Sequence, residues 1–395
     1  FNILLGPVLF LFFYFYMGPF DGMSNESFAI FCSVIWIATW WINEAVPIPI
    51  TSLLPLVLFP LTGGLDLSST SSAYGNKIIF FYMAGFFLAI AMEKWNLHQR
   101  IALLIIYFVG TNKKRMVLGF MLATAILSMF LSNTSTSIMM LPIGIAIASQ
   151  VSLRKNLSNS NFGKVLMLGI AYSASIGGFA TLIGTPPNGV LATQLPQLFP
   201  EAPDLTFSTW MIFALPMSGV YMILAWLLLT RLVFPLPSTT PFSGRDFIQN
   251  ELRKLGPMSV EERRVLAVFV SFALLLMTRK ERLFSADVDI FGWSYYLDNL
   301  LRSVGSAPVG YLIDDGTVSV GMALTLFMIP AGKAIGGKLL SWDDAKKILW
   351  GILLLFGGGL AIAKGFTTSG LSDYIASQLQ IWLGNASPFV IVVSP

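Results

Sequence analysis

The chain has 395 residues, of which 55% are hydrophobic and 11% are charged, and its mean hydropathy is +0.74. A soluble protein of this length carries about 25% charged residues, so the composition excludes an ordinary soluble domain and indicates a polytopic membrane protein. The net charge of +4 is small, and no basic patch interleaved with aromatic residues occurs, so we expect no nucleic-acid partner.

Apolar segments that span, or nearly span, a hydrocarbon core about 30 Å thick follow one another along the chain. They lie at about 1–17, 28–42, 46–62, 77–93, 116–131, 136–150, 164–195, 210–230, 262–278, 317–332 and 348–364. Gly and Pro shorten or interrupt several of them. We therefore expect an all-α polytopic membrane protein that contains interrupted helices as well as complete spans.

The segment 116–150 has basic residues on both sides, at 113–115 and at 154–155. The positive-inside rule places both flanks in the cytoplasm, so the segment enters the membrane and returns. Each arm has about fifteen residues, roughly 22 Å of helix, which is too short for a full crossing. We predict a re-entrant hairpin whose tip is the uncharged run SNTSTS (132–137). Such a tip lines something polar, because lipid would leave its backbone groups unpaired.

The apolar run 164–195 is interrupted by GTPPN (184–188). Two successive prolines remove two backbone donors, so we predict that two half-helices meet here and leave carbonyl groups free. The stretch 171–184 before the break is rich in Gly, Ala and Ser, which lets helices approach closely in lipid. A hairpin tip and an interrupted helix in one half of the chain are typical of the binding site of a secondary transporter.

Charged segments separate the remaining spans. Acidic and basic residues alternate in 231–264, and we predict that this segment lies at the cytoplasmic membrane surface. The loop 279–316 then falls outside the cell, where Arg279, Lys280 and Arg282 oppose the positive-inside rule. His98, the only histidine, is expected to have a structural role at a membrane edge.

Two parts of the chain resemble each other at a spacing of about 272 residues. LAIA at 88–91 recurs at 360–363, and with a two-residue gap NLHQRIA (96–102) aligns with GLSDYIA (370–376). Charged residues follow the helix in the first copy and precede it in the second, which predicts that the two copies cross the membrane in opposite directions as an inverted repeat. The alternative is chance similarity of two Gly-rich helices. The repeat then predicts a second SNT-like tip near position ~406. We therefore expect that the C-terminal part of the second half is missing, and that 385–395 forms the beginning of the second hairpin.

The two breaks offer neutral oxygen atoms and backbone amides. Carboxamide, hydroxyl and carbonyl oxygens suit a hard monovalent cation such as Na⁺, and a new helix start near Thr134 aims free N–H groups at an anion. The residues concerned are Ser128, Ser132, Asn133, Thr134, Gly184, Thr185 and Asn188. The alternative is a Ser/Thr run that bonds only to carbonyls of its own helix.

Four stretches closely resemble the divalent anion/sodium symporter family, whose members carry dicarboxylates, citrate and sulfate. They are SNTSTSIMMLP (132–142), AYSASIGGFATLIGTPPN (171–188), NEAVPIPITSLLPLVLFPLTG (43–63) and LLLFGGGLAIAK (353–364). The resemblance extends over essentially the whole chain. It implies a homodimer in the plasma (cell inner) membrane, in which a transport domain moves against a scaffold domain in an elevator mechanism.

The resemblance also implies roles for individual residues. The sodium site falls on Ser128, Ser132, Asn133, Gly184 and Asn188, and the substrate site on Ser132, Asn133, Thr134 and Thr185. The implied domains are 1–93 (first scaffold helices), 94–209 (first transport part, with hairpin 116–150 and broken helix 164–195), 210–364 (linking helix, cytoplasmic segment and second scaffold helices) and 365–395 (start of the second transport part). The family has a second SNT and a second Pro-Pro-Asn break, and neither occurs in this sequence.

These observations predict a secondary active transporter. We expect sodium-coupled symport of a small dianion, most simply a C4-dicarboxylate such as succinate. The alternatives are a sodium-independent dicarboxylate exchanger and a sodium-coupled carrier of citrate or sulfate. An intramembrane hydrolase needs a base beside its nucleophile, and no His or Asp accompanies a membrane-depth Ser, so we do not expect an enzyme.

Overall fold

The computed structural model describes residues 2–110, 112–151, 161–199, 201–202, 205–236, 244–279, 292–303, 305, 313–332 and 336–383. Within these ranges the chain forms helices and no named strand, with one isolated antiparallel bridge between Pro330 and Lys338. The predicted all-α class is thereby confirmed. The arm expected at 385–395 and the basic flank at 154–155 lie outside the described residues.

The polytopic membrane character follows from helix length and composition. Five helical stretches of the described residues are long and apolar enough to cross a membrane: Asn25–Asn43, Leu67–Lys94, Asn161–Phe179, Phe207–Val233 and Trp350–Ser369. Shorter apolar helical stretches cover Asn2–Met17, Ile48–Thr62, Leu97–Val109 and Asp315–Met328. The predicted apolar segments therefore fold as helices.

The chain divides into two compact units, 1–79 with 349–395 and 80–348, and the boundary falls within helix α6 (Lys77–Lys94). The other helices of the first unit are α1 (Asn2–Phe12), η1 (Phe13–Met17), α2 (Asn25–Asn43), α3 (Ile48–Thr51), α4 (Pro55–Thr62), α5 (Leu67–Tyr74), α18 (Trp350–Ser369) and α19 (Leu371–Leu383). Its core joins Ile30 and Ile37 of α2 to Phe59 of α4 and Leu371 of α19. The predicted span 46–62 is split into α3 and α4 because four prolines interrupt it.

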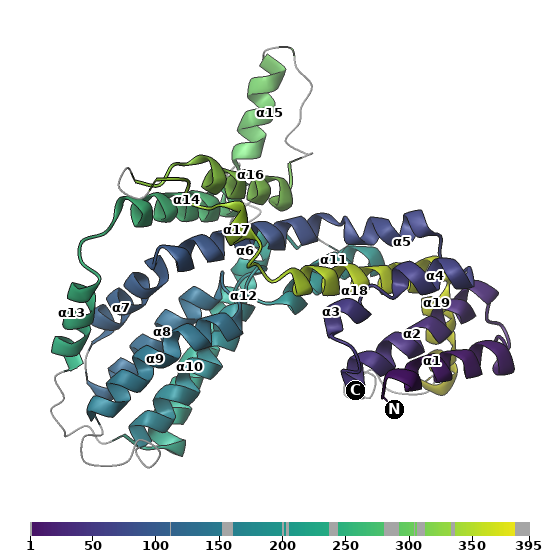
Figure 1. Cartoon of the computed structure of the whole chain (residues 1–395), viewed down its shortest axis with the longest axis horizontal. Helices are drawn as coiled ribbons and strands as arrows, with labels where there is room; N and C mark the ends of the chain where they lie inside the picture. The colour runs from purple at the N-terminus through teal and green to yellow at the C-terminus, as the bar shows by residue number, and fades with distance from the viewer. Residues whose placement is uncertain are drawn as a thin grey trace. The chain divides into compact units, whose positions relative to one another are not determined.

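The second unit contains the helices that carry the predicted hairpin and broken helix. They are α7 (Leu97–Val109), α8 (Lys113–Ser128), α9 (Asn133–Val151), α10 (Asn161–Phe179), α11 (Pro186–Leu198), α12 (Phe207–Leu227), η3 (Leu228–Val233), α13 (Gly244–Lys254), α14 (Val260–Met277), α15 (Trp293–Ser303), α16 (Asp315–Met328) and α17 (Trp342–Ala345). Helices α8, α9 and α10 lie side by side, and α7 packs against α8 (Figure 1).

The two segments predicted to repeat have the same local structure. Asn96 adopts a left-handed conformation (φ 55°) before the 13-residue α7, and Gly370 does so (φ 80°) before the 13-residue α19. Positions 96 and 370 are the pair that the gapped sequence alignment matches. Each long helix therefore ends in the same kind of left-handed turn and continues as a shorter helix. The inverted orientation of the two copies stays a prediction.

Ion pairs with buried carboxylates fix the corner between α6 and α7. Arg100 of α7 donates from Nε to Glu262 Oε1 (3.0 Å) and from Nη2 to Glu262 Oε2 (3.1 Å), a two-pronged pair at the start of α14. Lys94 Nζ lies 2.7 Å from Asp344 Oδ2. Burial alone would raise the pKa of Asp344, but hydrogen bonds from Lys94 and Ser341 lower it to about 2. This carboxylate is therefore charged at any physiological pH.

The structure explains Arg279, one of the three basic residues that opposed the predicted topology, while Lys280 and Arg282 lie outside the described residues. Arg279 Nε donates to Asp315 Oδ1 (2.7 Å), and Asp315 Oδ2 accepts from the Phe207 N–H at the start of α12 (2.8 Å). The charge of Arg279 is thus neutralised within the protein, so it carries little information about topology. His98 is buried at the α6–α7 corner with Nδ1 3.1 Å from the Met92 carbonyl, which is compatible with a structural role.

Candidate functional site

Two chain breaks within the second unit form the candidate site. Residues 129–132 separate α8 from α9, and 180–185 separate α10 from α11. The second break overlaps the predicted GTPPN segment (184–188) only at Gly184 and Thr185. The two prolines instead begin α11, a position that tolerates their missing N–H groups. Helices α8 and α9 follow one another across the first break and contact each other, so they form a helical hairpin; that it re-enters the membrane stays a prediction.

The first break is shorter than the predicted tip, 132–137. Helix α9 already begins at Asn133, so 133–137 form its first turns. The physical reason is a helix cap: Ser132 Oγ accepts a hydrogen bond from the Ser135 N–H at 3.2 Å. Ser, Asn and Thr favour helix starts as strongly as they favour loops, so this run begins a helix instead of forming an extended tip.

Gly178, at the C-terminal end of α10, is the point where the two breaks meet. A methyl carbon placed on Gly178 would lie 2.2 Å from Asn133 Oδ1, and one placed on Gly184 would lie 2.4 Å from the Gly178 carbonyl oxygen. Asn188 Nδ2 donates to that same carbonyl at 3.0 Å. Three of the predicted sodium-site residues, Asn133, Gly184 and Asn188, are therefore in contact with one glycine.

Ser128 completes this cluster from the last turn of α8. Its Oγ lies 2.7 Å from Asn133 Oδ1 and 2.7 Å from the Ala174 carbonyl oxygen of α10, and the residue is fully buried. A hydroxyl has one proton, so it donates to only one of these two acceptors at a time. Three uncharged oxygens, those of the Ser128 hydroxyl, the Asn133 amide and the Ala174 carbonyl, thus lie close together, and oxygens of this kind suit a cation.

The carbonyl groups around the breaks are more fully hydrogen-bonded than the sequence predicted. Thr181 Oγ1 donates to the Met129 carbonyl across the two breaks, and Asn188 Nδ2 donates to the Thr181 carbonyl at 2.7 Å. Trp210 Nε1 of α12 donates to the Phe179 carbonyl at 2.9 Å. The expectation of free carbonyls is therefore wrong for these positions. Side chains hold the irregular backbone in place, as buried polar groups require.

The two helix starts differ in their capacity to bind an anion. At α9, the N–H groups of Asn133 and Thr134 have no hydrogen-bond partner within the described part of the chain, and Thr134 is exposed. At α11, the first two residues are prolines without N–H groups, and the Asn188 N–H bonds to the Thr185 carbonyl at 3.2 Å. Free N–H groups and the helix dipole therefore make the start of α9 better suited to an anion than the start of α11.

The predicted residues consequently fall into three groups. Ser128, Asn133, Gly184 and Asn188 meet around Gly178, as described above. Ser132 caps α9 through its hydroxyl. Thr134 and Thr185 lie at the helix starts without a side-chain contact that ties them to this cluster within the described residues, and Thr185 is half-buried.

Tyr82 of α6 is a site residue that the sequence analysis missed. It is fully buried, its OH lies within hydrogen-bond distance of the Leu182 carbonyl and 3.0 Å from the Thr185 carbonyl, and it accepts from the Gly189 N–H at 3.1 Å. One hydroxyl thus supports both sides of the α10–α11 break. The only sequence signal was a tyrosine hydroxyl within the apolar run 77–93, where a buried OH needs a partner.

Replacing Tyr82 with phenylalanine is expected to destabilise the protein by about 1–3 kcal/mol, because two buried carbonyls and one N–H lose their shared partner. The measurement is thermal unfolding of the purified protein. Tyr172→Phe is the matched control, because Tyr172 lies on α10 with 54% of its surface exposed. Equal unfolding temperatures for the two variants would show that the hydroxyl does not support the break.

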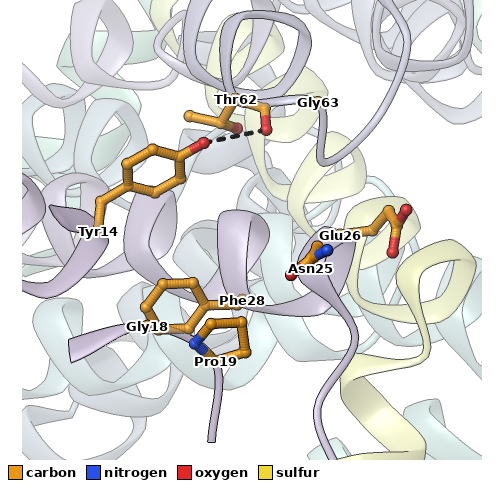
Figure 2. Close-up of a pocket in the computed structure, with 8 residues that line it drawn as sticks. All are labelled: Tyr14, Gly18, Pro19, Asn25, Glu26, Phe28, Thr62 and Gly63. Carbon is orange, nitrogen blue, oxygen red and sulfur yellow. Dashed lines mark hydrogen bonds between the residues drawn. The ribbon is translucent and has the colours of Figure 1, made fainter.

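A cavity of about 440 Å³ lies in the first unit (Figure 2). It is lined by Tyr14, Gly18, Pro19, Asn25, Glu26, Phe28, Thr62 and Gly63. The Tyr14 OH crosses it to the Thr62 carbonyl at 3.4 Å. None of the predicted site residues lines this cavity, so it is not part of the candidate site.

Comparison with known proteins relates the whole chain to one group of transporters. The model of the sodium:sulfate symporter transmembrane region matches residues 2–394. The sodium-dependent dicarboxylate transporters SdcS of Staphylococcus saprophyticus and of Staphylococcus aureus are each 40% identical to the chain over 398 residues. The aligned region covers 99% of this chain and 72% of each relative. These relatives are transporters and not enzymes.

Proposed function

The chain belongs to the sodium:sulfate symporter family, and on that premise we propose that it is a sodium-coupled symporter of a small dicarboxylate, with succinate as the simplest substrate. Relatives that are named sodium-dependent dicarboxylate transporters support the substrate class and the coupling ion. The structural observation that carries the proposal is the uncharged oxygen cluster around Gly178, which lies directly at the anion-binding start of α9.

In this proposal the sodium ion binds to the oxygens contributed by Ser128, Ser132, Asn133, Gly184 and Asn188. The dianion binds at the start of α9, through Ser132, Asn133 and Thr134 with Thr185 from the second break. Asn133 belongs to both sets, because its side chain lies in the oxygen cluster and its N–H lies at the helix start. Each ligand thus organises the residue that the other needs, which gives a favourable coupling free energy.

The absence of fixed charge in these residue sets has a consequence for coupling. Without an arginine or lysine, a dianion gains little electrostatic stabilisation from the site alone. A bound sodium ion supplies a positive charge, so the dianion binds well only after sodium. The same neutrality lets the substrate leave once sodium has left, whereas a buried fixed cation would hold a dianion strongly.

Transport is proposed to follow an elevator mechanism in a homodimer in the plasma membrane. The matching turns at Asn96 and Gly370 support an internal repeat, which is typical of alternating-access transporters. The proposed re-entrant hairpin consists of α8 and α9. The proposed scaffold and transport parts have the boundaries predicted above, 1–93, 94–209, 210–364 and 365–395.

The test is uptake of radiolabelled succinate into proteoliposomes that contain the purified chain. An inward sodium gradient is expected to drive accumulation, and replacing sodium with choline is expected to reduce it to the level of empty vesicles. Uptake that persists without sodium and depends on internal dicarboxylate would instead identify an exchanger. Competition by unlabelled citrate and sulfate tests the two sodium-coupled alternatives, and inhibition by either at lower concentration than succinate would reject a C4-dicarboxylate as the preferred substrate.

A further inference from the structure

Thr136 of α9 lacks a hydrogen bond that three other buried helical threonines make. A threonine inside a helix ordinarily donates its hydroxyl proton to the carbonyl four residues earlier. Thr70, Thr124 and Thr230 do so at 2.8, 2.7 and 2.6 Å. Thr136 is fully buried, and its Oγ1 has no hydrogen-bond partner among the residues that the structure describes.

The environment of Thr136 links this hydroxyl to the candidate site. Thr136 lies three residues after Asn133, on the same face of α9. That face packs on α10, because Asn133 lies against Gly178 and Gly144 lies against Ile170. Helical side chains lean toward the helix N-terminus, so Thr136 covers the turn that holds Ser132 and Asn133. Its hydroxyl is therefore on the side of the oxygen cluster.

A buried hydroxyl without a partner is unfavourable compared with a methyl group of the same shape. Such groups in a native protein point to a missing water, ion or functional role. The Ser132 carbonyl accepts the N–H of Thr136 at 2.9 Å, but unlike the Asp66 carbonyl, which accepts both the N–H and the hydroxyl of Thr70, it receives no bond from the Thr136 hydroxyl. Because no donor among the described residues bonds to it, the hydroxyl oxygen keeps both lone pairs available for a ligand that arrives from the side of the cluster.

We propose that Thr136 is a further sodium-site residue and that a sodium ion is the missing partner of its hydroxyl oxygen. This inference rests on the proposed function, since it adds an oxygen to the cation site formed by Ser128, Asn133 and Gly184. The neutral hydroxyl suits a monovalent cation as the other members of the site do. An ordered water in this position, with no effect on sodium, is the competing explanation.

The test compares Thr136→Val with Thr124→Val by sodium titration of thermal unfolding, with choline replacing sodium at constant ionic strength. Without sodium, Thr136→Val is expected to unfold at or above the wild-type temperature, because it loses an unpaired hydroxyl, and Thr124→Val below it. With sodium, Thr136→Val is expected to need about tenfold more sodium for half of the wild-type effect. Thr124→Val is expected to keep the wild-type sodium requirement, and Thr136→Ser is expected to restore it.

The outcomes separate this inference from the proposed function. If Thr136→Val needs the same sodium concentration as the wild-type protein, Thr136 is not a sodium-site residue. If the sodium response disappears in Asn133→Ala, the proposed sodium site is supported whatever the result for Thr136. No sodium response in the wild-type protein would overturn the proposed function. If Thr136→Val does not fold, Thr136→Ala is measured in its place, and a wild-type requirement in that variant would overturn the inference equally.

Discussion

Asn133→Ala is expected to lower sodium-driven dicarboxylate uptake by about tenfold or more and to leave the protein folded. The side chain of Asn133 lies 2.7 Å from Ser128 Oγ in the oxygen cluster, and the residue begins α9. A hydrogen bond or contact to a charged ligand contributes about 1.5–3 kcal/mol, so losing it slows uptake at limiting sodium by about tenfold to a hundredfold. Coupling between the two ligands increases this loss. The measurement is the initial rate of succinate uptake into proteoliposomes.

Folding is expected to survive this change because the α9 cap is the hydroxyl of Ser132 and not the side chain of Asn133. Asn161→Ala is the matched control, since Asn161 is exposed at the start of α10. It is expected to transport at the wild-type rate. Wild-type sodium-driven uptake in Asn133→Ala would remove the residue from the site.

Gly178→Ala is expected to produce nearly the same loss of uptake through displacement of Asn133. The added methyl carbon would lie 2.2 Å from Asn133 Oδ1 and 3.1 Å from Asn133 Nδ2, so the amide group must leave its place. The displaced atoms are the end of a side chain, and alanine favours a helix over glycine by about 1 kcal/mol. Thermal unfolding is therefore expected to change little while uptake falls by about tenfold or more, the loss expected from one contact to a charged ligand.

The neighbouring glycine provides a contrast that separates stability from function. A methyl carbon on Gly177 would lie 2.2 Å from the Ala125 carbonyl oxygen and 2.4 Å from its Cα, so α8 and α10 would have to move apart. Such overpacking destabilises by about 1–3 kcal/mol. Gly219→Ala is the control, because nothing lies within 4 Å of the added carbon. Gly178→Ala with wild-type uptake would contradict the proposed contact between Gly178 and Asn133.

Helix positions were largely predictable because charge and proline act locally. Basic flanks on 116–150 indicated a returning segment, and the structure contains the α8–α9 pair. The two prolines at 186–187 marked the start of α11. The tip was misplaced because Ser132 and the residues after it are good caps and poor helix-interior residues. A sequence pattern does not distinguish a loop from the first turn of a capped helix.

The residues of the candidate site could be predicted from the sequence, but the side chains that hold the backbone of the two breaks in place could not. Tyr82 lies about one hundred positions from the carbonyls that it binds, and tertiary packing, which no local pattern encodes, brings them together. The role of Gly178 was only indirectly visible, through the small residues of 171–184 that predicted close helix approach. The partners of the break carbonyls were missed for the same reason, since Thr181, Asn188 and Trp210 reach them across helices.

The accessibility of the α9 start tests the central claim most directly. The chain has one cysteine, the buried Cys32, so Thr134→Cys in a Cys32→Ala background gives a single reporter at the exposed first turn of α9. A membrane-impermeant maleimide is expected to label this cysteine, and sodium together with dicarboxylate is expected to slow labelling more than either alone. Absence of labelling from either face of the membrane, whichever ligands are present, would contradict a water-accessible site at this position.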